Sequence, residues 1–144
     1  MNLPKIKRLE WSFFYNCNAL IEVNLPNVEY IGTSCFSGCF ALPSLSLPKL
    51  TYADSNCFYR CHAMTSVDLP NLETSVGGMF GDCYALTTVN VPKLTSIPGG
   101  TFNKCNSLTK VELPSVTSVA QLGIRNSAIL KEVIFGTKIN NFAN

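Results

Sequence analysis

Two pairs of cysteines have a spacing that could hold a metal ion. Cys35 and Cys39 are four residues apart, as are Cys57 and Cys61, and the second pair follows the first by 22 residues. On a turn of helix each pair would share one face, and four thiolates can bind a tetrahedral zinc ion. The places that correspond to Cys35 elsewhere in the chain, however, hold unrelated residues: Phe13, Met79, Thr101 and Gly123. Because such tolerance is typical of packing positions, we expect no metal and no other cofactor.

Catalytic residues are equally scarce. The one histidine, His62, directly follows Cys61, but a cysteine nucleophile needs a base within hydrogen-bond reach and a third group that orients the base. No residue at a fixed spacing supplies that third group. The glycine pairs at 77–78 and 99–100 lack the GxxxxGK[ST] and GxGxxG patterns of phosphate-binding loops. We therefore predict that the protein is not an enzyme and that His62 is an exposed loop residue.

Seven cysteines in 144 residues also raise the question of disulfides. Stacked strands place corresponding residues about 4.8 Å apart, which lies within the Cα range of a disulfide. Five of the cysteines nevertheless occupy one column of a repeat, and an unpaired cysteine packs as a compact hydrophobic residue. We predict buried, reduced thiols.

These residues belong to a tandem repeat. Counting the residue before each proline as position 1, apolar residues recur at positions 1, 4, 12, 15, 18 and 21, and position 12 is Phe and position 15 Cys in five successive units. A fixed period in the twenties predicts stacked coils that contact only their neighbours. We predict one domain, residues 1–144, with repeats that begin at 3, 25, 47, 69, 91 and 113 and a partial repeat from 135. The period is marked by six prolines at intervals of 22 residues, Pro4, Pro26, Pro48, Pro70, Pro92 and Pro114.

Local patterns predict the elements of each coil. Val67, Asp68 and Leu69 alternate as a strand does, so we expect a short parallel strand at positions 19–22, which the following proline ends because it has no N–H. Positions 4 and 7 should point inward from a second extended segment on the far side. Positions 9–15 predict one helical turn that carries Phe and Cys inward. The predicted fold is a solenoid of about six and a half repeats, with a parallel sheet on one face and extended segments and single helical turns elsewhere.

The repeat resembles that of the BspA-like leucine-rich repeat family. The resemblance spans residues 3 to about 141 and is quoted from one unit: Phe58, Cys61, Met64, Val67, Leu69, Pro70 and Leu72. It implies a bacterial or protozoan surface protein used in adhesion and protein recognition, or a phage-associated repeat protein. Two departures are a period slightly shorter than is usual for the family and the small residues Ala53 and Ser75 at position 7.

The composition and net charge limit the classes of partner that the chain is expected to bind. The chain is 47% hydrophobic and 14% charged, with a net charge of +2, which favours neither nucleic-acid binding nor attraction to acidic lipid. No stretch approaches the roughly 18 apolar residues of a membrane span, so we expect no membrane insertion. The N-terminal MNLPKIKRLE has no apolar run of a signal peptide. We expect part of a larger cell-surface or extracellular protein, or a component of a phage particle.

Two sets of residues are candidate binding surfaces. The first, here called the strand face, comprises positions 20 and 22, which point outward from the predicted strands: Glu22, Asn24, Ser44, Ser46, Ser66, Asp68, Thr88, Asn90, Lys110 and Glu112. Parallel strands ordinarily have both faces covered, so an uncovered face invites a ligand. The second, the aromatic stripe, follows the Phe and Cys columns and suits recognition because its members have polar tips or large rings: Tyr15, Phe40, Tyr59, His62 and Tyr84. Simple solvation of the first set and covering of the loop edge by the second are the alternatives.

We therefore predict a non-enzymatic binding or adhesion module that recognises a protein or glycan. The alternative is a structural spacer, part of a longer shaft or tail fibre. The first coil is nearly regular, whereas the sixth has lost its Phe and Cys to Ile124 and Ser127. Because a terminal coil exposes apolar columns and strand edges, we expect the first coil to be covered, either by further repeats of a longer chain or by end-to-end association with another copy. We also expect Phe58 to be buried and its neighbour Tyr59 to lie on the surface.

Overall fold

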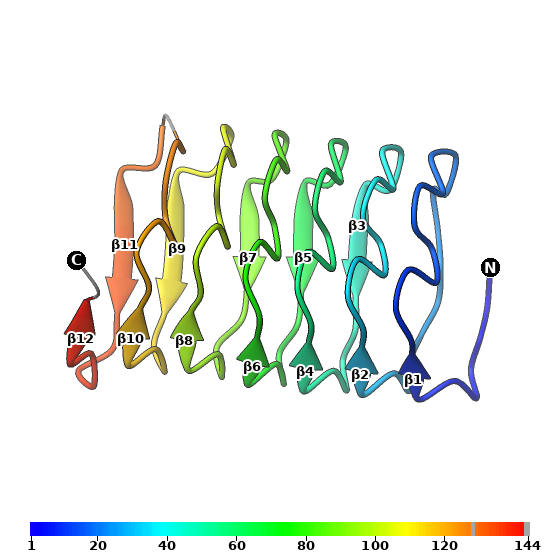
Figure 1. The fold of residues 1–144 in the computed structure, drawn as a ribbon, viewed down its shortest axis with the longest axis horizontal. Helices are drawn as coiled ribbons and strands as arrows, with labels where there is room; N and C mark the ends of the chain where they lie inside the picture. The colour runs from blue at the N-terminus through cyan, green and yellow to red at the C-terminus, as the bar shows by residue number, and fades with distance from the viewer. Residues whose placement is uncertain (128, 143–144) are drawn as a thin grey trace.

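The 22-residue period folds into stacked coils, as predicted. The computed structural model describes residues 1–127 and 129–142, and Figure 1 shows the coils side by side along the long axis with the termini at opposite ends. No helix occurs in this part of the chain, and therefore none that could cross a membrane.

The strands predicted in the second to sixth coils form along one face of the solenoid, and those that pair do so in register. The strand predicted at residues 21–24 of the first coil does not form, because its only partner there is a single bridge from Asn24 to Asn2. Partners lie one repeat apart, as in Leu45 beside Val67. Their central valines and leucines point inward, while the flanking polar residues point out. The strands form two parallel groups, β3 (Ser44–Ser46), β5 (Ser66–Asp68) and β7 (Thr88–Asn90) in one, and β9 (Lys110–Leu113) and β11 (Glu132–Phe135) in the other.

The second extended segment forms a parallel sheet of its own. Position 7 points inward and position 6 outward, as in Ile31 and Tyr30, so the predicted orientation is confirmed. The sequence did not indicate that these segments pair with one another. They do so in two groups, β1 (Arg8–Leu9), β2 (Tyr30–Ile31), β4 (Tyr52–Ala53) and β6 (Thr74–Ser75), and β8 (Ser96–Ile97), β10 (Ser118–Val119) and β12 (Asn141–Phe142).

The Phe column is the centre of the core. Phe36, Phe58, Phe80 and Phe102 are completely buried. Neighbouring rings from Phe14 to Phe102 stack with centroids 5.0–5.7 Å apart and planes within 20° of one another. Each ring therefore fills the space between the two coils beside it.

The prediction of a helical turn at positions 9–15 is wrong. Positions 10 and 14 have positive φ in every coil, and a left-handed residue interrupts a right-handed helix. The peptide groups between them turn along the stack, so that the Phe36 N–H donates to the Cys57 carbonyl of the next coil at 2.8 Å. The residues with this conformation are Ser12, Asn16, Ser34, Gly38, Asn56, Arg60, Gly78, Asp82, Gly100, Lys104, Leu122 and Asn126.

Both sheets are interrupted at the same level. β6 and β7 belong to the fourth coil, residues 69–90, and β8 and β9 to the fifth, residues 91–112; neither β6 with β8 nor β7 with β9 forms a paired ladder. The wider interval can be followed in Figure 1 between the green and yellow strands. We call the opening between β7 and β9 the fissure.

Candidate binding surfaces and the cysteine column

The strand face lies where the sequence placed it. All ten predicted residues are on the outer side of the solenoid, with Ser66 half-buried and the other nine exposed. Glu132, in β11, continues this face and was not among the predicted residues. The carboxylates of Glu22, Asp68, Glu112 and Glu132 are accompanied on positions 20 and 22 by one ammonium group, that of Lys110. This face is therefore acidic although the whole chain carries a charge of +2.

Lys110 is held by two of these carboxylates. Its Nζ lies 2.9 Å from Glu112 Oε1 and 3.7 Å from Glu132 Oε2. The hydrogen bond to Glu112, followed by the attraction of both carboxylates, raises the pKa of Lys110 above its usual value. The ammonium group is thus charged at any physiological pH and neutralises only part of the acidic face.

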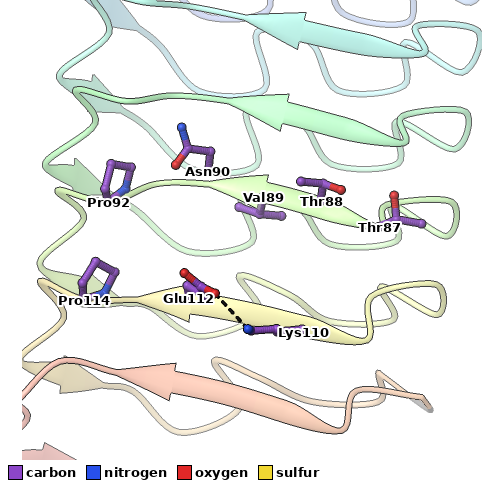
Figure 2. Close-up of a pocket in the computed structure, with 8 residues that line it drawn as sticks. All are labelled: Thr87, Thr88, Val89, Asn90, Pro92, Lys110, Glu112 and Pro114. Carbon is purple, nitrogen blue, oxygen red and sulfur yellow. Dashed lines mark ion pairs between the residues drawn. The ribbon is translucent and has the colours of Figure 1, made fainter.

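A groove of about 410 Å³ opens on the strand face at the fissure. Figure 2 shows that residues of β7 form one side and residues of β9 the other, and that prolines close one end. Its volume is within the usual range for binding sites of small molecules and short segments. The lining includes Thr88, Asn90, Lys110, Glu112, Pro92 and Pro114.

The aromatic stripe does not form one open surface. Phe40, His62 and Tyr84 share position 16 and stack in a row, with centroids 4.7 Å apart in the first pair and 4.8 Å in the second. Because the rings cover one another's faces, mainly their edges reach solvent. The expectation that His62 is an exposed loop residue is wrong, since it is half-buried between two rings and its buried Nε2 has no hydrogen-bond partner in the described chain.

The two tyrosines of the stripe at position 13 differ from each other. Tyr15 is exposed, whereas Tyr59 is half-buried and its hydroxyl donates to Asp82 Oδ2 at 3.0 Å. Asp82 is buried, and its Oδ1 lies 3.6 Å from Lys104 Nζ. The hydrogen bond from Tyr59 to Asp82, together with burial, raises the pKa of Tyr59. Tyr59 is therefore part of a polar network and not the simple surface residue that the sequence suggested.

The cysteine column has a clear structural task. From the second coil to the fifth, the thiol donates to the carbonyl of the Phe in the preceding coil, as Cys61 Sγ does to Phe36 at 3.1 Å and Cys83 Sγ to Phe58 at 3.0 Å. In the sixth coil the Ser127 hydroxyl makes the equivalent bond to Phe102 at 2.7 Å. The column therefore requires a small side chain with one hydrogen-bond donor, which explains why Ser can replace Cys.

Burial makes these thiols poor nucleophiles and poor metal ligands. It raises the pKa of Cys35 to about 11 and those of Cys39 and Cys105 to about 12. Nucleophilic and metal-bound cysteines need the opposite shift, because the thiolate is the active form. Over residues 1–127 and 129–142, no three His, Cys, Asp or Glu side chains gather closely enough to hold a metal ion.

We predict that native thiol labelling will distinguish one cysteine from six. Cys17 is half-buried in the first coil, whereas the other six are buried, so Cys17 should react first with iodoacetamide at neutral pH. Mass spectrometry should show one fast label on the native chain and seven labels after denaturation without a reducing agent. Fewer than seven labels on the denatured chain would show that some cysteines form disulfides.

A polar ladder at position 3 was not predicted from the sequence. Asn27 Nδ2 donates to the Pro4 carbonyl of the preceding coil at 2.7 Å, and Lys49 Nζ donates to Asn27 Oδ1 at 2.7 Å. Asn71 and Lys93 repeat this pattern two coils later. The alternation of Lys and Asn in this column was the available signal.

A second missed contact lies on the far sheet. Tyr30 and Tyr52 stack at 5.3 Å, and Arg8 Cζ lies 3.9 Å above the free side of the Tyr30 ring. Both tyrosines were visible at position 6 of the repeat, but the arginine was not associated with them. These three side chains join the first, second and third coils on the outer side of the far sheet.

The first coil exposes large side chains at its open end. Trp11 is 79% exposed and Phe13 is 55% exposed. Phe13 packs against Phe14 in a T-shaped arrangement, at a centroid distance of 4.9 Å and an interplanar angle of 69°. Leu3 and Ile6 of the same coil are only half-buried. Coverage of this open end of the first coil by another coil stays a prediction.

Parallel strands, a 22-residue period and inward Leu, Val, Phe and Cys columns together define a leucine-rich repeat solenoid. A family model described as the BspA type leucine rich repeat region matches residues 1–97 and 77–144, with six copies. The chain belongs to this family, whose fold is that of interaction or surface repeat modules and is generally non-enzymatic.

Solved structures agree with this assignment. The crystal structure of a leucine-rich repeat protein from T. pallidum has 25% sequence identity and a TM-score of 0.91, over 99% of this chain and 72% of the other. A leucine-rich repeat protein from Bacteroides ovatus has 16% identity and a TM-score of 0.67, over 100% of this chain and 47% of the other, and shows the likeness of fold alone. A search of curated proteins found no match.

Proposed function

We propose that the chain is a binding module that recognises a protein partner through its strand face. The observation that carries this proposal is an uncovered face of parallel strands that is acidic and hollowed by a groove. Parallel sheets are usually covered on both faces, and electrostatic complementarity guides protein partners to such a surface. We place its site of action at a cell surface or on a phage particle, in keeping with the family.

A structural feature favours the strand face over the aromatic stripe. The rings of Phe40, His62 and Tyr84 are already stacked on one another, so they offer little open ring face to a partner. The strand-face side chains of Thr88 and Asn90 are exposed and line the groove. The strand face is therefore our principal site.

We expect one bulky substitution on the strand face to reduce binding and its counterpart on the far sheet to leave binding unchanged. Thr88→Arg and Thr74→Arg both replace an exposed strand threonine, the first beside the groove and the second on the opposite sheet. Binding of labelled chain to a panel of purified extracellular-matrix proteins and to a glycan array is the measurement. At least one protein should be bound, and Thr88→Arg should weaken it by about tenfold.

The alternative function is a spacer within a longer shaft or tail fibre. A spacer should bind nothing on the panel, or should lose binding equally with both substitutions. Circular dichroism and thermal unfolding of the two variants must first match those of the unchanged chain, so that a loss of folding is not taken for a loss of binding.

A further inference from the structure

The fissure lacks backbone hydrogen bonds that the coils on either side of it form. In the neighbouring pairs of coils, the Thr87 N–H donates to the Thr65 carbonyl at 2.9 Å, and the Lys131 N–H donates to the Thr109 carbonyl at 2.9 Å. Within the described part of the chain, the equivalent bond from the Thr109 N–H to the Thr87 carbonyl is absent.

Side chains follow the same pattern as the backbone. The Thr87 hydroxyl donates to the Thr65 carbonyl at 2.9 Å, but the hydroxyl of Thr109 makes no such bond to Thr87 in the described chain. Val89, which points into the core beside the fissure, is half-buried, whereas Val67 and Val111 on either side are 2% exposed. Backbone, side chains and burial therefore locate the same opening.

The two coils remain joined away from the strand face. At the turns formed by positions 9–15, the Phe80 N–H donates to the Thr101 carbonyl at 2.9 Å. On the far sheet, which contains β6 and β8, the Thr95 N–H donates to the Glu73 carbonyl at 3.2 Å. The far sheet is weakened further along, where Pro98 has no N–H to donate. The coils are thus held on two sides and open on the strand face.

The opening presents groups that suit a polypeptide main chain. The Thr87 carbonyl and the Thr109 N–H have no partner among the described residues, and both residues are exposed. An extended peptide offers alternating N–H and C=O groups and binds unpaired strand edges in this way. The groove of about 410 Å³ gives such a segment room beside these groups.

Charge defines the side chain that such a segment would carry. Glu112 lines the groove, Glu132 lies on the next strand, and Lys110 is bonded to both. Asp68 adds a further carboxylate on the strand face, where its Oδ1 accepts a hydrogen bond from Asn90 Nδ2 at 2.6 Å. The surroundings therefore favour a cation over an anion.

We propose that the fissure between β7 and β9 binds a short extended segment of a partner protein that carries an arginine or lysine side chain. The segment hydrogen-bonds to the Thr87 carbonyl and the Thr109 N–H, and its cation pairs with Glu112. This inference rests on the proposed function, because it specifies the partner chemistry of the same face.

The test is a titration of isotope-labelled chain, followed by amide NMR, with three blocked pentapeptides of sequence TRTRT, TQTQT and TETET. We expect TRTRT to cause saturable shifts of the Val89, Val91, Thr109 and Lys110 amides. We expect TQTQT to bind about tenfold more weakly, and TETET more weakly again. Equal binding of all three peptides would overturn the proposed charge preference.

Three variants separate the two parts of the proposal. Glu112→Gln should weaken the binding of TRTRT until its affinity approaches that of TQTQT. The control Glu22→Gln, on the same face in the first coil, should leave the affinities of both peptides unchanged. Thr109→Pro removes the Thr109 N–H from the fissure and should weaken the binding of all three peptides. Proline is compatible with this position of the repeat, because Pro43 occupies it in the second coil.

The outcomes distinguish this inference from the function on which it rests. Saturable shifts confined to other parts of the strand face would overturn the fissure as the site and leave the proposed function standing. No saturable shift with any peptide, in a chain whose spectrum is that of a folded protein, would also overturn the inference. The proposed function fails separately, when the Thr88→Arg and Thr74→Arg variants bind the protein panel alike.

Discussion

Phe58→Ala is expected to lower the free energy of unfolding by about 3–5 kcal/mol, because a fully buried ring is removed and its cavity stays partly open. The Phe58 ring is stacked between those of Phe36, at 5.7 Å, and Phe80, at 5.5 Å. Neither neighbouring coil can close the gap without shifting its own hydrogen bonds along the stack. Urea unfolding followed by circular dichroism at neutral pH measures the loss.

Tyr15→Ala is the matched control for this prediction. Tyr15 is an exposed aromatic residue in the same part of the repeat, so its loss should cost less than about 1 kcal/mol. Tyr59 is a poorer control than the sequence suggested, because its hydroxyl bonds to the buried Asp82. Similar losses for Phe58→Ala and Tyr15→Ala would contradict the assignment of inner and outer positions.

The coils and the strand face could be predicted because they depend on periodicity. A side chain at a given position of each unit has the same orientation, so the columns of Leu, Val, Phe and Cys identified the core. Alternation around Val67 identified the outward residues Ser66 and Asp68. Orientation in a strand has a period of two residues, and such a pattern is visible without any knowledge of tertiary contacts.

The turn at positions 9–15 was predicted wrongly because apolar spacing was read as helical. Positions 10 and 14 hold mainly Ser, Asn, Asp and Gly, and Asn, Asp and Gly are the residue types that most readily adopt positive φ. This signal was present in the sequence. Arg60, Lys104 and Leu122 obscured it, since they adopt the same conformation without that preference.

Lateral contacts were the hardest to predict. The stack of Phe40, His62 and Tyr84 depends on ring rotations between coils, which column composition does not specify. The fissure is harder still, because the departures of the inward columns beside it, Ser75 at position 7 and Val91 at position 1, do not by themselves predict an opening. Pro98 is a further mark in the sequence at this level, because it occupies a place where neighbouring coils donate an N–H.

Alkaline pH is expected to unfold the protein through its buried thiols. Burial raises the pKa of all six buried cysteines, to about 11 for Cys35 and about 12 for Cys39 and Cys105. In the unfolded chain a thiol titrates near 8.5. Below that pH both states keep the proton and stability does not change. Above it the unfolded state loses protons that the folded state retains, so stability falls as pH rises towards the folded pKa values.

The size of this effect follows from the number of protons. Each buried thiol should cost up to about 1.4 kcal/mol per pH unit above its unfolded pKa. Six such thiols together should remove up to about 8 kcal/mol per pH unit, which is comparable to the whole stability of a typical domain. We therefore expect cooperative unfolding near pH 10, measurable as a steep fall in the urea midpoint between about pH 8.5 and pH 9.5, below the range in which tyrosines titrate.

Serine substitutions allow the slope to be assigned to particular residues. Ser127 shows that the column accepts a hydroxyl that bonds to the Phe carbonyl, so Cys83→Ser should preserve the fold and reduce the slope by the share of one thiol, about 1.4 kcal/mol per pH unit. Cys17→Ser, at the half-buried end of the column, should leave the slope almost unchanged. If stability were constant from pH 8 to pH 10, or if the two substitutions changed the slope equally, buried thiols would not be the cause of alkaline unfolding.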